Sequence, residues 1–215
     1  MIYKNINKLL VGLSFFIPLI IYILTMAPTT SFWDCGEFIA TSVILGVPHP
    51  PGAPLYLLLG NIFASFPTFS DIGARVNLIS PIASALSVMF LYLIIVYLIE
   101  EYRGKITTIY DAIIIYGSAF TAAITFSVTD AHWFNAVEAE VYSVSTFFTA
   151  IVVWMILKWG KQDNWNIRYL LIIVYMLGLA IGVHLLNLLA LPFIGLIIYF
   201  KKFNFTVKNF LLTIF

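Results

Sequence analysis

Long apolar runs separated by short polar stretches make up most of this chain. A membrane-spanning helix needs about 20 mostly apolar residues. Suitable runs lie at 9–26, 76–99, 112–129, 142–157 and 169–200. Because 169–200 is longer than one span and shorter than two full ones, we expect it to form a short hairpin that turns near His184 to Asn187. The pattern predicts an all-α, multi-pass helical membrane protein with about six spans and the start of a further one near Phe210.

The composition supports the membrane assignment. Apolar residues make up 62% of the 215 residues and charged residues 10%, whereas a soluble domain has about 45–50% and roughly 25%. This excludes a cytosolic enzyme, a nucleic-acid binder and a disordered protein. The net charge of +1 points to no acidic partner, and the single cysteine, Cys35, excludes an internal disulfide or a thiolate-rich zinc site.

The two ends of the chain show whether the first apolar run is a signal peptide and whether the chain belongs to a larger module. Lys4 and Lys8 precede an apolar run, as in a signal peptide, but the run is too long for one and lacks a small-residue cleavage site. We therefore expect an uncleaved first span. The chain stops at Phe215 inside an apolar run, so we expect residues 1–215 to be a single transmembrane domain, the N-terminal part of a larger module.

The basic residues predict the orientation. With the N-terminus inside and the spans above, ten of the eleven basic residues fall inside: Lys4, Lys8, Arg103, Lys105, Lys158, Lys161, Arg168, Lys201, Lys202 and Lys208. Arg75 alone falls outside, which fits the positive-inside rule. If 55–66 also spanned the membrane, eight of the ten would move outside, so we expect 55–66 to be re-entrant or interfacial.

This topology places one group of acids and all the histidines on the external face. Its members are Asp34, Glu37, Asp71, Asp130, Glu138, Glu140, His49, His132 and His184. The acids could hold a hard divalent cation, although their spacing does not select one. No Walker loop or Rossmann glycine fingerprint occurs, so we expect no nucleotide-handling domain in this chain.

The first external loop, about 27–75, offers two candidate acids. Ser31 and Asp34 fit a loose capping box, so we expect a short helix to begin here. Asp34 is then either a helix-start carboxylate that offsets the dipole or a general base at the bilayer surface, and Glu37 has the same two interpretations. His49 follows on a proline-rich turn, which is either a plain loop or a rigid support for a site.

The second external loop, 130–142, carries three acids and no basic residue. If it is helical, Asn135, Glu138 and Tyr142 share one face, and Glu140 points about 200° away from Glu138. At most one of the two glutamates then faces a shared site. The alternative is a solvated acidic loop, and His184 could be a simple interfacial polar group.

Three motifs together resemble one known family. They are the segments 29–38 (TTSFWDCGEF), 49–55 (HPPGAPL) and 133–142 (WFNAVEAEVY). They resemble a multi-pass membrane family, long labelled a domain of unknown function, that includes the protein O-mannosyltransferase acting on IPT domains. The family is similar to the GT-C glycosyltransferases, helical membrane enzymes that use a polyprenyl-phosphate sugar on the external face.

The resemblance implies roles for particular residues. Asp34 matches the catalytic base of the first external loop, with Glu37 as its neighbour. The substrate pocket would involve His49, Arg75, His132, Asn135, Glu138, Glu140 and His184. Arg75 is the only external basic residue available for the phosphate, which makes the stabilisation of the leaving group the least explained part of the site.

The implied function is transfer of a hexose, mannose in the first instance, from a polyprenyl-phosphate carrier to Ser or Thr of an exported protein. The expected partners are this lipid-linked donor, the protein acceptor and membrane lipid, with no nucleic acid. The implied location is a bacterial inner membrane, with the N-terminus cytoplasmic and the active face periplasmic. The main alternative is a transporter or flippase, which would place ionisable residues at mid-membrane, and a non-catalytic scaffold is a second.

Overall fold

The structure, a computed structural model, describes residues 2–104 and 106–214. All regular elements in these ranges are helical, which confirms the all-α prediction. They are α1 (Ile2–Thr25), α2 (Cys35–Ile44), α3 (Pro54–Ser65), α4 (Ile72–Asn77), α5 (Ile79–Arg103), α6 (Ile109–Ser127), α7 (Asp130–Ala136), α8 (Val141–Gly160), α9 (Ile167–Ile181), the 3₁₀ turn η1 (Leu185–Leu189), α10 (Ala190–Lys202) and α11 (Val207–Ile214).

Five helical stretches of the described chain are long and apolar enough to cross a membrane. They are Asn5–Thr25, Ile72–Arg103, Ile109–Ser127, Val141–Gly160 and Leu185–Lys202. α9 is also apolar but has 15 residues, which at 1.5 Å per residue reach about 22 Å against a hydrocarbon core of about 30 Å. The chain is therefore a multi-pass helical membrane protein, and α9, the remaining predicted span, is shorter than a full span.

The structure shows the form of the two segments whose spanning was ambiguous, 169–200 and 55–66. The run 169–200 is a hairpin as predicted, with a turn between α9 and η1 at residues 182–184. The segment 55–66 forms α3, whose 12 residues are too few to span, in agreement with the prediction that it does not cross. α11 packs against α10, and it occupies the apolar run that begins near Phe210.

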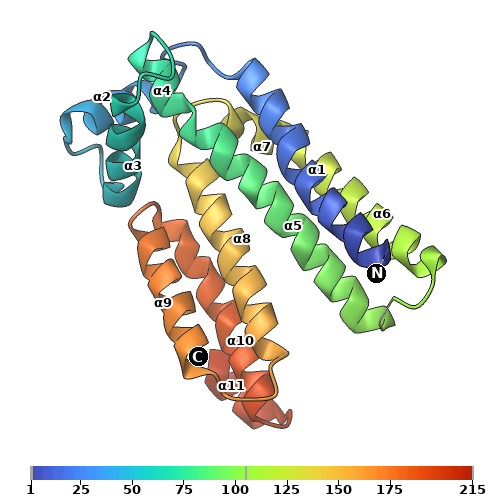
Figure 1. The fold of residues 1–215 in the computed structure, drawn as a ribbon. Coiled ribbons are helices and arrows are strands. Elements are labelled where there is room, and N and C mark those ends of the chain that lie inside the picture. Colours follow the sequence, from blue (N-terminus) through green and yellow to red (C-terminus); the bar gives the residue numbers. More distant parts are fainter. Residues whose placement is uncertain (1, 105, 215) are drawn as a thin grey trace.

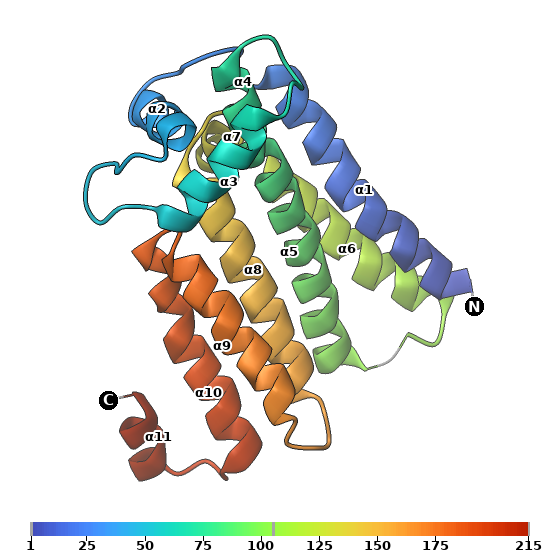
Figure 2. The same ribbon diagram turned by 60° about the vertical axis from the view of Figure 1, so that its left-hand side comes forward.

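α5 is the central helix of the molecule. It packs against α1 and α6 on one side and against α8 on the other, while α9 and α10 pack on α8 (Figures 1 and 2). The buried face of α5 near its start consists of small residues, Ala83, Ser84, Ala85 and Ser87. Small side chains allow membrane helices to approach closely, and here the Ser84 hydroxyl donates to the Ser143 hydroxyl of α8 over 3.1 Å.

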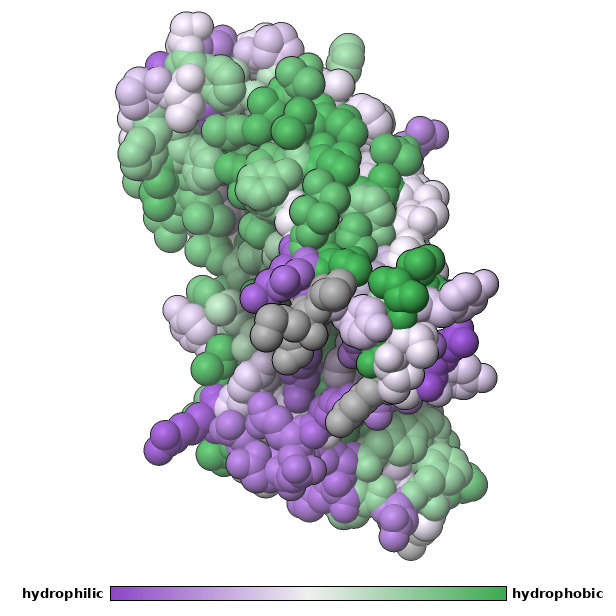
Figure 3. Space-filling model, turned by 45° about the vertical axis from the view of Figure 1, so that its right-hand side comes forward, coloured by the Kyte–Doolittle hydropathy of each residue, from purple (hydrophilic) through white to green (hydrophobic). Residues whose placement is uncertain are grey.

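The connections between the long helices gather at two ends of the bundle (Figure 1). The long-loop end consists of residues 26–78, 128–140 and 182–184, and includes α2, α3, α4 and α7. The described residues of the short-loop end are 104, 106–108, 161–166 and 203–206, and the N-terminus of α1 lies beside it (Figures 1 and 2). Figure 3 shows a broad hydrophobic area over the helices on one face and a cluster of hydrophilic side chains below it.

The basic residues follow this division, as the topology prediction requires. Those near the short-loop end are Lys4, Lys8, Arg103, Lys158, Lys161, Arg168, Lys201, Lys202 and Lys208, whereas Arg75 is at the long-loop end. Lys105 lies outside the described residues. All nine acids and histidines predicted for the opposite face lie at the long-loop end. The fold thus separates the described basic residues, apart from Arg75, from this group of acids and histidines.

Candidate functional site

A single buried side chain ties the loops of the long-loop end together. The Asn77 amide, fully buried at the end of α4, donates to the carbonyls of Ala27 (2.8 Å) and Thr29 (2.9 Å). Its oxygen accepts the N–H of Ala139 over 2.9 Å and the Cys35 thiol over 3.6 Å. Asn77 therefore joins the segment after α1, the start of α2 and the segment before α8. The sequence analysis missed this residue, although an asparagine entering a long apolar run is the signal that could have identified it.

Asp34 stands at the start of α2. It is the N-cap residue of α2, so the expected capping box, which needs Ser31 as the N-cap, is wrong. The Asp34 side chain makes no capping hydrogen bond. Trp33, just before it, has a left-handed backbone (φ 58°) that turns the chain into the helix. The Asp34 carboxylate is exposed and free of a structural task at the helix start.

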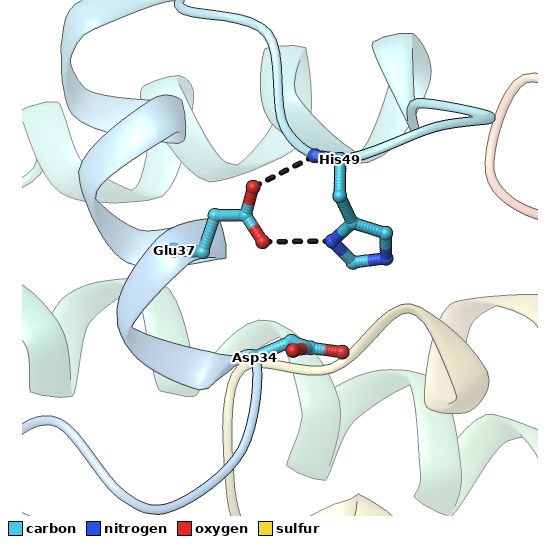
Figure 4. A group of neighbouring side chains, drawn as sticks. All are labelled: Asp34, Glu37 and His49. Atoms are coloured by element: carbon cyan, nitrogen blue, oxygen red, sulfur yellow. Dashed lines mark hydrogen bonds and ion pairs between the residues drawn. The ribbon is translucent and has the colours of Figure 1, made fainter.

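Glu37 and His49 form a two-point contact. One Glu37 carboxylate oxygen accepts the backbone N–H of His49 and the other faces the ring Nδ1, each over 2.7 Å. Figure 4 shows this contact, with the Asp34 carboxylate beside it. The hydrogen bond to His49 lowers the pKa of Glu37, and the same bond raises the pKa of His49. Glu37 thus fixes the orientation of the His49 ring.

The proline-rich loop is held from both sides. Gly52 adopts φ +80°, a conformation that favours glycine, and its N–H donates to the His49 carbonyl over 3.0 Å. Leu55, in the first turn of α3, donates its N–H to the carbonyl of Gly182 over 2.8 Å. This bond brings the turn after α9, with His184, next to the loop that carries His49.

These elements enclose a small polar cleft of about 40 Å³. Its lining residues are Asp34, Phe38, His49, Pro51, Gly52, Ala53, Glu140, Val141, Tyr142, Val183 and His184. The rings of Tyr142 and His184 lie 5.2 Å apart across it. The structure therefore brings together four of the predicted site residues, Asp34, His49, Glu140 and His184, from three separate segments, and Glu37 joins them through His49.

Glu140 is the buried acid of this cleft. It precedes α8 and is 6% exposed. Burial, together with the negative charges of Asp34 and Glu138, raises the pKa of Glu140 to about 7, against the opposing effects of the Val141 N–H and His49. A carboxyl group that exchanges its proton near neutral pH is typical of catalytic sites.

Glu138 does not line the cleft, so only one of the two glutamates does. The segment is not helical at this point, because α7 ends at Ala136 and α8 begins at Val141. Glu138 is 1% exposed, and its Oε1 has no hydrogen-bond partner among the described residues. A buried acid without a partner is costly, and its charge acts on the Cys35 and Glu140 side chains behind the cleft.

Three further predicted residues lie away from the cleft. The Arg75 guanidinium donates to the carbonyls of Phe69, Ala64 and Ser70, which braces the loop between α3 and α4. His132 is buried, with its ring 4.4 Å from that of Phe126, and burial lowers the pKa of His132 to about 4. The Asn135 amide donates to the Ala131 carbonyl of its own helix. These three side chains therefore contact other parts of the fold and do not line the cleft.

An apolar groove of about 410 Å³ adjoins the polar cleft. It is lined by Leu45, Gly46, Val47, Pro48, Pro51, Gly52, Ala53, Pro54, Leu57 and Leu58. Pro51, Gly52 and Ala53 line both cavities. The apolar groove and the polar cleft thus share one wall.

Asp34, Glu37 and His49 are also the described residues best placed to bind a metal ion. Each offers one ligand atom, and these atoms all lie within 4.8 Å of one another. Two carboxylates and an imidazole form a donor set that accepts several divalent cations.

Comparison with known proteins gives a consistent result. Residues 34–207 match the family described as "Protein O-mannosyl-transferase TMEM260 N-terminal domain". The chain is 26% identical over 138 residues to Protein O-mannosyl-transferase tmem260 of Dictyostelium discoideum, which covers 63% of this chain and 15% of that protein. It is 28% identical over 133 residues to Protein O-mannosyl-transferase TMEM260 of Mus musculus, which covers 62% and 17%. The chain thus spans a small part of these relatives, and no solved structure matches it.

Proposed function

The chain belongs to the family of protein O-mannosyl-transferase TMEM260 N-terminal domains, and from this premise we propose that it carries the catalytic cleft of a membrane glycosyltransferase. The reaction is transfer of a hexose, mannose in the first instance, from a polyprenyl-phosphate carrier to Ser or Thr of an exported protein. The names of the relatives support protein O-mannosylation. The carrier and the residue roles rest on the geometry of the site.

The observation that carries this proposal is the wall shared by the polar cleft and the apolar groove. A lipid-linked sugar has an isoprenoid chain and a polar head, so its enzyme needs an apolar path that leads to a polar site. The groove offers the path, with Val47 and Leu58 on its exposed side, and the cleft beyond Pro51–Ala53 offers the carboxylates. Apolar contact binds the chain, and the cleft receives the head group.

The positions of Asp34, Glu37 and His49 also support a role for each carboxylate in the transfer. A Ser or Thr hydroxyl of the acceptor attacks the anomeric carbon, the bond from that carbon to the carrier phosphate breaks, and the configuration inverts. Asp34 accepts the hydroxyl proton, since its exposed carboxylate lines the cleft and has no capping bond to lose. Glu37 acts through His49 by holding the ring at two points, so we assign it a positioning role beside the base.

The distribution of charge supports an orientation. The basic residues lie at the short-loop end except for Arg75, whereas acids lie at both ends, and basic loops remain on the cytoplasmic side. The cleft then faces the side to which exported proteins are delivered. We propose that this side is the periplasmic face of a bacterial inner membrane, the location expected in the sequence analysis.

The test is Asp34→Asn in the full-length protein, with Asp130→Asn as the matched control. Asp130 is an exposed acid of the same end on α7 and does not line the cleft. Transfer of sugar to an exported acceptor should fall about 100- to 10,000-fold in the first variant and stay unchanged in the second. Undiminished transfer by Asp34→Asn at normal protein levels would exclude Asp34 as the base.

A further inference from the structure

We propose that Asp34, Glu37 and His49 bind one divalent cation, and that its open positions take phosphate oxygens of the lipid-linked donor. The cation site itself stands on the geometry of the three side chains. The role toward phosphate rests on the proposed function.

The donor atoms are close enough to share one ion. They all lie within 4.8 Å of one another, whereas ligands at about 2.1 Å from an ion lie up to about 4.2 Å apart. A shift of a few tenths of an ångström closes the difference. Glu37 Oε2 and His49 Nδ1 already share a proton over 2.7 Å, and a cation between them would take the place of that proton.

A second observation points to a positive ion at this place. Glu140 is 6% exposed and lines the cleft with Asp34 and His49. Its carboxyl group is thus a nearly buried acid beside the cluster, and it belongs to neither of the two ion pairs of the described residues. Burial of such a group is costly unless a counter-charge is present.

The charge balance of the long-loop end leads to the same conclusion. Asp34, Glu37 and Glu140 converge on one place, and the one arginine of this end, Arg75, is bonded to three carbonyls elsewhere. A phosphate group that approaches three carboxylates is repelled. A divalent cation removes the repulsion and supplies the positive charge that the leaving phosphate requires.

The three ligands also leave room for such a substrate. Asp34 and His49 are exposed and Glu37 is half-buried, so the coordination shell would be completed from the cleft. Cations that act on phosphates are commonly held by one or two carboxylates, with phosphate and water in the other positions. The hydrogen bond from Leu55 to Gly182 and the left-handed Gly52 fix the loop that presents His49.

The experiment uses the full-length protein in detergent with Mn²⁺ as the probe. The signal of free Mn²⁺ in electron paramagnetic resonance reports binding directly, without any sugar transfer. We compare the wild type with Asp34→Asn, Glu37→Gln and the control Asp130→Asn. We expect one bound Mn²⁺ per chain, an affinity at least about 10-fold lower in both cluster variants, and an unchanged affinity in the control. Asp34→Asn keeps the proposal testable if Glu37→Gln unfolds the loop, because the Asp34 side chain makes no capping bond.

Two results would overturn the proposal. One is the absence of binding at about millimolar Mn²⁺, the weak limit for protein cation sites, and the other is equal binding by all variants. The proposed function fails separately. If the wild type binds Mn²⁺ and Asp34→Asn keeps full transfer, Asp34 is not the catalytic base but the cation site stands. If Mn²⁺ does not bind and transfer persists in a chelator, the cation site is rejected but the transferase function stands.

Discussion

The two ends of the bundle treat polar groups in opposite ways. At the short-loop end the lysines stay near solvent and lie over aromatic rings, as Lys201 does over Trp159 at 4.3 Å. At the long-loop end polar side chains are buried, and Asn77, Glu138 and Glu140 are all at most 6% exposed. Lysines with aromatic neighbours are typical of anchoring at a membrane interface. Buried acids are costly, and their presence at one end is the reason that the proposed catalytic cleft is placed there.

Replacement of Asn77 by alanine should have the largest effect on stability. Asn77→Ala leaves the carbonyls of Ala27 and Thr29 and the N–H of Ala139 without their partner. Each unsatisfied buried group costs about 1–3 kcal/mol, so we expect a loss of about 4 kcal/mol in the free energy of unfolding. Cys35, the single cysteine of the chain and fully buried, should become reactive toward a thiol reagent. Asn135→Ala, which loses one bond within α7, is the control, and an unreactive Cys35 in Asn77→Ala would contradict the role of Asn77.

Replacement of Glu140 by glutamine should change how stability depends on pH. The pKa of Glu140 is about 7 in the folded protein against an ordinary value of 4.5. The folded state therefore holds a proton that the unfolded state releases, and wild-type stability falls as the pH rises from 4.5 through about 7. Glu140→Gln lacks this loss, so it should exceed the wild type by about 2–3 kcal/mol at about pH 8.

The measurement for Glu140 is the free energy of unfolding at about pH 5 and about pH 8. The two proteins should differ less at the lower pH, and Asp130→Asn should follow the wild type throughout because its side chain is exposed. A parallel pH dependence in Glu140→Gln and the wild type would show that Glu140 does not titrate in this range.

Removal of an ion pair at the short-loop end should have the smallest effect. Lys161 and Glu101 meet at 2.6 Å, and both side chains are more than half exposed. Exposed pairs of this kind contribute about 0–1 kcal/mol, so Lys161→Gln should shift thermal unfolding little, and less in high salt. A loss as large as that of Asn77→Ala would show that the two ends do not differ in the way described.

Much of the fold could be predicted from the sequence. Apolar runs of fixed length predict helices, and basic residues predict which loops lie together, because burial in lipid and solvation of charge act on each segment separately. The hairpin near His184 followed from the length of the run 169–200, and the non-spanning α3 followed from the positions of the basic residues. The count of spans differs because α9 ends at Ile181, before it reaches the length of a bilayer.

The candidate site could be predicted only in part. The acids and histidines of the predicted external loops indicated the long-loop end, and Asp34, His49, Glu140 and His184 line one cleft there. Arg75, His132 and Asn135 were predicted for the same site but lie elsewhere, because backbone carbonyls and an aromatic ring near them are closer partners. Residue type does not reveal which of several nearby partners a side chain takes.

The sequence by itself determined that this is a helical membrane protein and which of its ends carries most of the basic residues, because hydropathy and charge are properties of each residue. Only the tertiary structure decided that Glu37 holds His49, that Glu140 faces Asp34 across 106 positions of sequence, and that an apolar groove adjoins their cleft. Those contacts depend on loops that Asn77 and the Leu55–Gly182 bond draw together. Contacts of this kind join segments that are far apart in the sequence, so a local residue pattern does not predict them.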